Sequence, residues 1–344
     1  MKGELKTNSE VEGYYKNKVL LVTGGAGSIG SEITKKVLEY NPSVIRVLDN
    51  NETALFELEE ELNSNKLRVF YGDVRDKDRL KRAFDNVDII FHAGALKHVP
   101  LCEFNPFDAV KTNIIGTQNV LDVALDRDVE KVIFVSTDKA VNPINVMGAT
   151  KLLAERLTIS ANHYTGDKDT IFSCVRFGNV LNSRGSVIPV FKNQIKNGGP
   201  VKITDKEMTR FIMGIPEAVE LILKAGQMAK GEDIFILKMP STNIMDLAEV
   251  MIENLAKIYD QIPEEIEIEI IGKRVGEKMY EELMTADESL YAIDDGELFI
   301  LNSNNQVNLN NTMEYNSDYV DKLSKNQIRD IINDTLFENR NYIY

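Results

Sequence analysis

A glycine cluster between an apolar segment and a helical segment constrains the fold of this chain more than any other feature. Gly24-Gly25-Ala26-Gly27-Ser28-Ile29-Gly30 follows the apolar run Lys18–Thr23 and precedes a segment with helical periodicity, Ile33–Tyr40. Glycines let the backbone turn tightly and approach a pyrophosphate, whose charge is favoured by N–H groups at the helix N-terminus. Asp49 ends the next apolar run, about 20 residues on. This combination predicts a dinucleotide-binding site.

The carboxylate of Asp49 determines which dinucleotide we expect. It would accept hydrogen bonds from the adenosine ribose hydroxyls and would repel a 2′-phosphate, so NAD is favoured over NADP. Arg46, in the same strand, is the one residue that weakens this preference. Asp73, just after the third strand, would contact the adenine edge or would simply cap a helix. The alternative to a cofactor site is a glycine turn that binds nothing, and the strand–turn–helix context argues against it.

Hydrophobic periodicity along the first half of the chain predicts a doubly wound α/β fold. Short apolar runs alternate with helical segments, which is typical of βαβ units, and runs buried on both faces indicate a mostly parallel sheet of the Rossmann type. The expected strands are Lys18–Thr23, Val44–Asp49, Leu67–Tyr71, Val87–His92 and Lys131–Ser136. The expected helices between and after them are Ile33–Tyr40, Thr53–Asn63, Lys77–Phe84, Ala109–Arg127 and Met147–His163.

The rhythm of strands and helices loosens after Arg176, where prolines separate shorter elements. Ile266–Ile271 alternates apolar and acidic residues and suits an edge strand. The last residues are rich in Asn, Asp and Glu and end in an expected helix, Lys325–Asn339, either docked or partly disordered. The expected division is an NAD-binding domain at 1–180 containing the catalytic segment 136–151, a smaller α/β substrate-binding domain at 181–290 with segments that cross back to the sheet, and a tail at 291–344.

Composition excludes several classes of function. Forty Lys and Arg residues against 54 Asp and Glu give a net charge of −14, which argues against binding to nucleic acid or to anionic membranes. Cys102 and Cys174 lie far apart, and the three histidines form no HExxH motif, so we expect no metal site. No apolar run approaches 18 residues and the N-terminus lacks the pattern of a signal peptide, so we expect a cytoplasmic protein without membrane insertion.

Candidate reactive groups follow the fifth expected strand. Thr137, Asp138 and Lys139 come directly after it, and ligands in such sheets bind beyond the carboxyl ends of the strands. Met147 and Lys151 lie four residues apart at the start of the next helix, so they share one face of it. The alternative for Asp138 and Lys139 is a solvated turn at the end of a strand.

These motifs resemble the extended short-chain dehydrogenase/reductase superfamily, whose usual YxxxK pattern appears here with Met147 in place of tyrosine. A methionine cannot transfer a proton, so an enzyme that relies on the phenol would lose its activity. Within the superfamily the chain is similar, over about residues 18–284, to the UDP-N-acetylglucosamine 4,6-dehydratases of capsule and glycan biosynthesis, which include members with this methionine. The matching stretches include TGGAGSIGSE, FHAGALKHVP, STDKAVNPINVMGATK, VRFGNVLNSRGSVIPVF and GKRVGEK.

The resemblance implies a redox-neutral dehydration. Hydride leaves sugar C4 for the nicotinamide, a base removes the C5 proton, an acid protonates the C6 hydroxyl, and the hydride returns to C6. NAD is then regenerated at every turnover and stays tightly bound. The family pattern makes Asp138 the acid and Lys139 the base, with Thr137 on the C4 oxygen, Lys151 on the nicotinamide ribose and Met147 in packing contact. To act as a base, Lys139 must be neutral, and we expect burial and neighbouring positive charge to favour that form.

The resemblance also assigns the binding residues. The alternative for each charged member is an ordinary surface ion pair. The expected cofactor-binding residues are Gly24, Gly27, Ser28, Ile29, Gly30, Asp49, Asp73, Val74, Ala93 and Lys151. The expected substrate-binding residues are Lys97, Arg176, Asn179, Arg210, Arg274 and Glu277.

The expected product is UDP-2-acetamido-2,6-dideoxy-hex-4-ulose for surface glycans. Retention of the C5 configuration is favoured because Leu48-Asp49-Asn50-Asn51-Glu52 looks more like the retaining branch of the family. The alternatives, in order, are a C5-inverting dehydratase, a UDP-hexose 4-epimerase and a non-catalytic NAD-sensing scaffold. Family members are commonly dimers or hexamers, so a homo-oligomer is expected. Asn113 is expected to support the active site from its helix.

Overall fold

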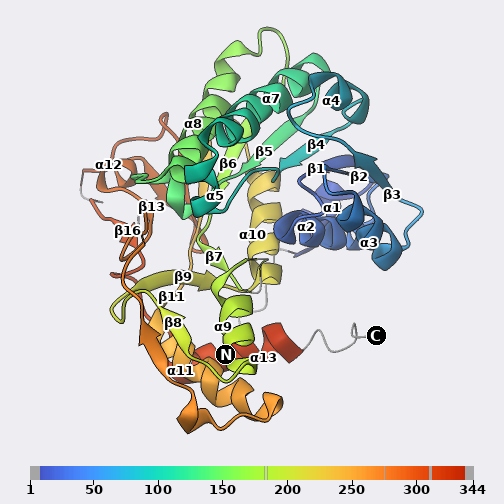
Figure 1. Ribbon diagram of the computed structural model, residues 1–344. Coiled ribbons are helices and arrows are strands. Elements are labelled where there is room, and N and C mark those ends of the chain that lie inside the picture. Colours follow the sequence, from blue (N-terminus) through green and yellow to red (C-terminus); the bar gives the residue numbers. More distant parts are fainter. Residues whose placement is uncertain (1–7, 182, 184, 275, 310–311, 338–344) are drawn as a thin grey trace.

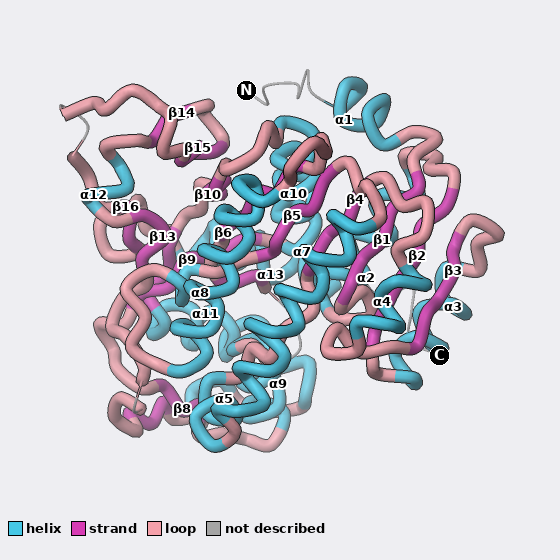
Figure 2. The backbone as a smooth tube through the Cα atoms, turned by 90° about the horizontal axis from the view of Figure 1, so that it is seen from above, coloured by secondary structure: helices cyan, strands magenta, loops and turns pink. Residues whose placement is uncertain are grey.

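A nine-stranded, mostly parallel sheet forms the centre of the computed structural model (Figures 1 and 2). The structure describes residues 8–181, 183, 185–274, 276–309 and 312–337. The expected doubly wound Rossmann fold is confirmed. In spatial order the strands are β14 (Ala292–Asp294), β15 (Leu298–Leu301), β10 (Ile234–Leu237), β6 (Ile171–Arg176), β5 (Lys131–Val135), β4 (Ile89–His92), β1 (Val19–Thr23), β2 (Val44–Asp49) and β3 (Leu67–Tyr71). Only β14 and β15 run antiparallel to their neighbours.

Successive residues of the central strands pack against opposite layers of helices. Leu20 and Val22 lie in one apolar cluster, while Leu21 lies in the cluster on the other face of the sheet. A fully buried side chain of this size contributes about 1.5–3 kcal/mol, which is why both faces must be covered. One layer contains α1 (Asn8–Tyr15), α2 (Ser28–Glu39), α3 (Glu52–Leu62) and α10 (Ile215–Met228), and the other contains α4 (Lys77–Ala83), α7 (Gly116–Asp126) and α8 (Val146–Ser160).

The order of the strands places a crevice above β1 and β4. The chain leaves β1 towards β2 on one side, whereas β4 continues to β5 on the other, so the connections diverge between them. Ligands of open α/β sheets bind at this point, beyond the carboxyl ends of the strands. Two backbone hydrogen bonds close the floor of the crevice, from Ala93 N–H to Thr23 O at 3.0 Å and from Gly24 N–H to Leu48 O at 2.8 Å.

A smaller lobe has its own apolar core, which includes Phe191, Leu247, Met251 and Ile328 (lower part of Figure 1). Two short sheets accompany its helices. These elements are α9 (Val187–Lys196), α11 (Ile244–Leu255), α13 (Lys325–Phe337), the sheet β11 (Ser241–Asn243)–β9 (Thr209–Met213)–β7 (Asn179–Val180), and the pair β12 (Ile268–Ile270)–β8 (Val201–Ile203). A third short sheet, β13 (Glu282–Met284)–β16 (Tyr315–Asn316), packs instead on the apolar core of the large sheet. As expected for an edge strand, β12 pairs on one side, with β8.

The described part of the expected tail is docked on both lobes. β14 and β15 extend the large sheet, whereas α13 packs against α11 in the small lobe. Between β13 and β14 lies the short helix α12 (Ala286–Ser289). The chain therefore crosses between the lobes several times after β6. No helix among the described residues has the length and apolar character needed to span a bilayer.

The helix expected at Ala109–Arg127 is interrupted. The structure has α5 (Val99–Phe104), α6 (Pro106–Ala109) and a π-helical turn, Val110–Ile115, before α7 begins. The buried side chain of Asn113 lies in this turn and binds both backbone groups of Leu96, at 2.8 and 3.0 Å, and the hydroxyl of Thr150 at 2.9 Å. The extra residue of a π turn changes which side chains face inward.

Candidate active site

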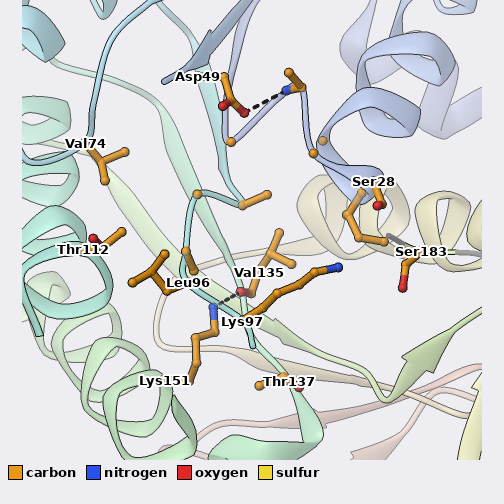
Figure 3. A pocket seen from close by; sticks show the side chains of 18 of the residues that line it. Ser28, Asp49, Val74, Leu96, Lys97, Thr112, Val135, Thr137, Lys151 and Ser183 are labelled. Atoms are coloured by element: carbon orange, nitrogen blue, oxygen red, sulfur yellow. Dashed lines mark hydrogen bonds between the residues drawn. The ribbon is translucent and has the colours of Figure 1, made fainter. Parts of the chain in front are cut away.

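A cavity of about 580 Å³ lies at the carboxyl ends of the parallel strands. Figure 3 shows many of the side chains that line it, which come from the loops after successive strands, the first turn of α2, the π-helical turn and α8. Among the expected cofactor-binding residues, all ten line this cavity: Gly24, Gly27, Ser28, Ile29, Gly30, Asp49, Asp73, Val74, Ala93 and Lys151. Thr137, Lys139 and Met147 line the same space.

The glycine turn packs closely against the chain around it only because side chains are missing. Gly24 has φ +65°, and a Cβ there would lie 2.5 Å from Gly94 Cα. A Cβ on Gly30 would collide with the carbonyl oxygen of Gly24. The first turn of α2 has Gly27 as its N-cap, and no side chain in the described part of the chain caps it. This turn fits a pyrophosphate bound at a helix N-terminus.

Asp49 is held where it would hydrogen-bond an adenosine ribose. Its carboxylate accepts from Ala26 N–H at 3.1 Å and from Asn51 N–H at 3.0 Å (Figure 3). The guanidinium of Arg46 donates instead to carbonyl oxygens at the end of α4, at 2.6 and 2.7 Å. Asp73 is tied to Arg75, whose hydrogen bonds outweigh burial and lower the pKa of that carboxyl. The carboxylate that should discriminate against a 2′-phosphate is therefore not neutralised by Arg46.

Lys151 reaches the centre of the cavity from α8. Its Nζ donates to Val135 O at 2.6 Å and lies 4.0 Å from the centroid of the Phe134 ring (Figure 3). Burial lowers the pKa of Lys151 to about 8. Met147 is buried one helical turn earlier and offers no titratable group.

Asp138 and Lys139 form a close pair at the edge of the cavity. Lys139 Nζ donates to Asp138 Oδ1 at 2.9 Å, and Thr137 Oγ1 donates to the same oxygen at 2.8 Å. Asp138 is fully buried. Burial by itself lowers the pKa of Lys139, but the charges of Asp138 and Glu281 outweigh it and raise that pKa. The expectation that the surroundings favour neutral Lys139 is therefore wrong for the protein alone.

The expected substrate-binding residues divide into two groups. Lys97 and Asn179 line the cavity. Arg176 does not: it is 1% exposed and its guanidinium binds Glu155 and Glu288 between β6, α8 and α12. We correct its assignment, because the two carboxylates take four of its five N–H donors and the carbonyl oxygen of Leu283 takes the fifth, which leaves none for a diphosphate.

Arg210, Arg274 and Glu277 lie outside the lining of the cavity but are brought together beside it. Arg210 donates to three backbone carbonyls and lies 3.8 Å from Glu277. Glu277 in turn accepts from the backbone N–H of the exposed Arg274 at 3.2 Å. Their loop packs on the catalytic segment, since Asn145 donates to Gly276 O at 2.9 Å. Their contact with substrate remains a prediction.

Glu281 is the residue that sequence reasoning missed. It is buried just before β13, and its Oε1 lies 3.5 Å from Lys139 Nζ. Two adjacent glutamates, Glu281 and Glu282, follow the expected substrate segment, and nothing in their spacing tells which one faces inward. A pairing across 142 positions of sequence is visible only in the fold.

Comparison with known families identifies the group to which this site belongs. Residues 20–303 match the family described as "Polysaccharide biosynthesis protein". The chain belongs to that family. A Methanocaldococcus jannaschii member named "Uncharacterized membrane protein MJ1061" is 63% identical over 94% of this chain and 97% of its own length. A Campylobacter jejuni UDP-N-acetylglucosamine 4,6-dehydratase (inverting) is 44% identical over 80% of both chains.

Other proteins similar to this chain include a named epimerase and two of solved structure. A Rickettsia conorii UDP-glucose 4-epimerase is 42% identical over 81% of both chains. The structure of Pen from Bacillus thuringiensis has a TM-score of 0.88 and 46% identity, covering 93% of this chain and 98% of that one. DesIV from Streptomyces venezuelae, a dTDP-glucose 4,6-dehydratase with NAD bound, has a TM-score of 0.66 at 24% identity, covering 76% and 86%, and shows the shared fold. The protein is an enzyme of the nucleotide-sugar dehydratase and epimerase group.

Proposed function

We propose that the protein is a UDP-N-acetylglucosamine 4,6-dehydratase that forms UDP-2-acetamido-2,6-dideoxy-hex-4-ulose for surface glycans. The observation that carries this proposal is the Asp138–Lys139 pair at 2.9 Å, beside a cavity whose described lining contains Met147 and no tyrosine. An elimination across C5 and C6 needs an acid and a base close together, whereas oxidation and reduction at C4 alone do not. The similarity to the C. jejuni dehydratase supports the same choice.

The cavity fits NAD, and this fit is part of the proposal. The glycine turn and the N-terminus of α2 would hold the pyrophosphate, Asp49 the adenosine ribose and Lys151 the nicotinamide ribose. Bound there, NAD would accept two electrons from sugar C4 and later return them at C6. Tight retention is expected because the hydride returns to the sugar at every turnover, and preference over NADP because Arg46 binds carbonyl oxygens and not Asp49.

The protein's own groups carry the proton transfers. Thr137 would hydrogen-bond the C4 oxygen and pass its proton to Asp138, whose Oδ1 it already contacts. Neutral Lys139 would take the C5 proton, which a ketone at C4 makes acidic. Protonated Asp138 would then give its proton to the C6 hydroxyl, which leaves as water. Lys139 returns a proton to C5 at the end, so both residues regain their starting states.

The proposed function does not extend to the configuration at C5. The expectation of retention finds no support in the relatives, since the C. jejuni enzymes of 44% and 43% identity are named as inverting. A homo-oligomer, either a dimer or a hexamer, and a cytoplasmic location stay predictions. The two cysteines of the chain, Cys102 and Cys174, are both buried and free, which fits a reducing compartment.

Proton NMR and mass spectrometry of one reaction test this proposal. Purified protein with NAD and UDP-N-acetylglucosamine in deuterated water should give a product lighter by one water, with deuterium at C5. The C5 coupling pattern then reads the configuration. A product that has lost water but carries no ketone at C4, or no reaction at all, would exclude the dehydratase.

Two controls separate the competing functions. Lys139→Ala should lose at least about 100-fold in dehydration rate, the usual effect of removing a general base, while NAD still binds by calorimetry. A UDP-hexose 4-epimerase is the second candidate, favoured by the R. conorii relative. It would change the sugar without changing its mass, and it would tolerate the Lys139 replacement better than a dehydratase.

A further inference from the structure

Glu281 is a second carboxylate close to Lys139, in addition to Asp138. Its Oε1 is 3.5 Å from Lys139 Nζ and 4.0 Å from Arg210 Nε. Its backbone is fixed by two hydrogen bonds with Ser317, from Glu281 N–H to Oγ at 3.0 Å and from Ser317 N–H to Glu281 O at 2.9 Å. Glu281 is 4% exposed and is not part of the cavity lining, so it acts on substrate only through its neighbours.

Two carboxyl oxygens around Lys139 are buried without a donor. Within the described residues, neither Asp138 Oδ2 nor Glu281 Oε2 has a hydrogen-bond partner. Two ionised carboxylates share the amine of Lys139, with Arg210 4.0 Å from one of them, and each would bury a charged oxygen that has no donor, which is costly. A proton on one of these carboxyls removes that cost.

We propose that Glu281 is a positioning residue that stores the proton which Lys139 must lose before it acts as the base. This inference rests on the proposed dehydration. In the transfer, the N–H bond of Lys139 breaks and an O–H bond forms on Glu281, so ammonium and carboxylate become amine and carboxylic acid with no other reactant. The amine then takes the C5 proton and later returns it, while Glu281 keeps the stored proton throughout the cycle.

The charges that surround Glu281 suit a shared proton. Lys139 and Asp138 face it from the 3₁₀ turn after β5, Arg210 from β9, and Lys278 from its own loop. Burial and the charge of Asp138 raise the pKa of Glu281, while the three cations oppose that rise. A movement of about 0.5 Å would bring the ion pair to hydrogen-bond distance.

Competitive labelling with acetic anhydride tests the inference without any catalytic turnover. Lys139 lines the cavity and its side chain is 25% exposed, so a small acylating reagent reaches it. Only a neutral amine reacts. If Glu281 takes the proton, a constant fraction of Lys139 is neutral while the pair holds one proton, so its reactivity should level off below the pH at which the pair loses that proton. In Glu281→Gln the reactivity should keep falling about tenfold per pH unit.

Steady-state dehydration should follow the same pattern. The rate of the wild type relative to Glu281→Gln should grow about tenfold for each pH unit below the pKa of Lys139 in the variant. Glu281→Asp keeps a carboxyl and should retain a plateau. Glu282→Gln is the matched control: Glu282 pairs with Lys278 at 3.1 Å, and its loss should leave both curves as in the wild type.

Two results would overturn the inference. One is an identical slope for Lys139 in the wild type and in Glu281→Gln. The other is a higher reactivity of Lys139 in Glu281→Gln than in the wild type at low pH, which would mean that Glu281 only stabilises the charged amine. A plateau in labelling from a protein that does not dehydrate UDP-N-acetylglucosamine would reject the proposed function and leave this proton store standing.

Discussion

Lys139 and Lys151 line one cavity, yet their pKa values move in opposite directions. Burial lowers both, but Asp138 and Glu281 reverse the effect for Lys139, whereas Lys151 has a carbonyl oxygen and the face of Phe134 as its nearest partners. Lys139 is therefore charged in the free protein, and Lys151 titrates at about pH 8. The pKa of Lys139 thus lies above that of an ordinary lysine, whereas Lys151 loses its proton near pH 8.

The buried ammonium of Lys151 should make stability depend on pH. Its pKa is about 8 when folded and 10.5 when unfolded, so the unfolded chain binds more protons between these values. Relative to Lys151→Met, the wild type should be penalised in full below pH 8 and should regain roughly 2–3 kcal/mol as pH rises towards 10.5. Urea unfolding of both proteins at pH 7 and pH 10.5 measures the change. A difference that stays constant would show that the ammonium is not desolvated.

Contacts between residues close in sequence were predictable, and contacts between residues far apart in sequence were not. The cofactor residues follow from a local rule, because strand, glycine turn and acidic strand end are fixed within about 30 residues. The role of Arg176 was not predictable, since Glu155 and Glu288, which neutralise it, come from separate elements. The contact of Glu281 with Lys139 was not predictable for the same reason.

Among the elements, apolar strands were the most predictable. The bounds expected for β2 and β3 match those in the structure, because short runs rich in Val, Ile, Phe and Tyr have a strong strand signal. The helix at Ala109–Arg127 was expected to be regular, and apolar periodicity did not indicate that a polar side chain, Asn113, turns inward from it. Buried polar contacts, unlike apolar stripes, have no period in sequence.

Arg176 joins three elements, so its replacement should lower the free energy of unfolding. Arg176→Met would leave the carboxylates of Glu155 and Glu288 without their cation, which should cost about 3–5 kcal/mol. Urea unfolding measures the cost, and Glu155→Gln in the same chain should recover part of it. For the folded fraction, KM for the nucleotide sugar should stay unchanged. A large rise in KM with normal stability would restore Arg176 to the substrate site.

At the scale of the whole molecule, the two lobes are not consecutive pieces of chain. After β6 the chain enters the small lobe, returns for α10 and β10, leaves again, returns for β14 and β15, and ends its described part with α13 on α11. The large sheet is therefore completed by residues that follow 180 by more than a hundred positions. Sequence rhythm suggested a boundary near 180, but the sheet does not end there.

A fragment containing residues 1–180 should consequently fail to fold as a cooperative unit. It would leave β6 as an open edge and would expose the apolar face that α10 covers, including partners of Ile222 and Leu223. Circular dichroism during urea titration should show a broad transition, and NAD should not bind measurably. A sharp transition with NAD binding would demonstrate an independent domain. The full chain serves as the reference.

The anchoring of Glu281 by Ser317 sets an order of events during synthesis on the ribosome. Every residue of the cofactor cradle and the Asp138–Lys139 pair has been translated by the time residue 180 is added. The carboxyl behind the lysine arrives a hundred residues later, and the hydroxyl that anchors its backbone is among the last groups described. If Glu281 stores the proton as proposed, a nascent chain would carry the amine of Lys139 well before the carboxyl that discharges it.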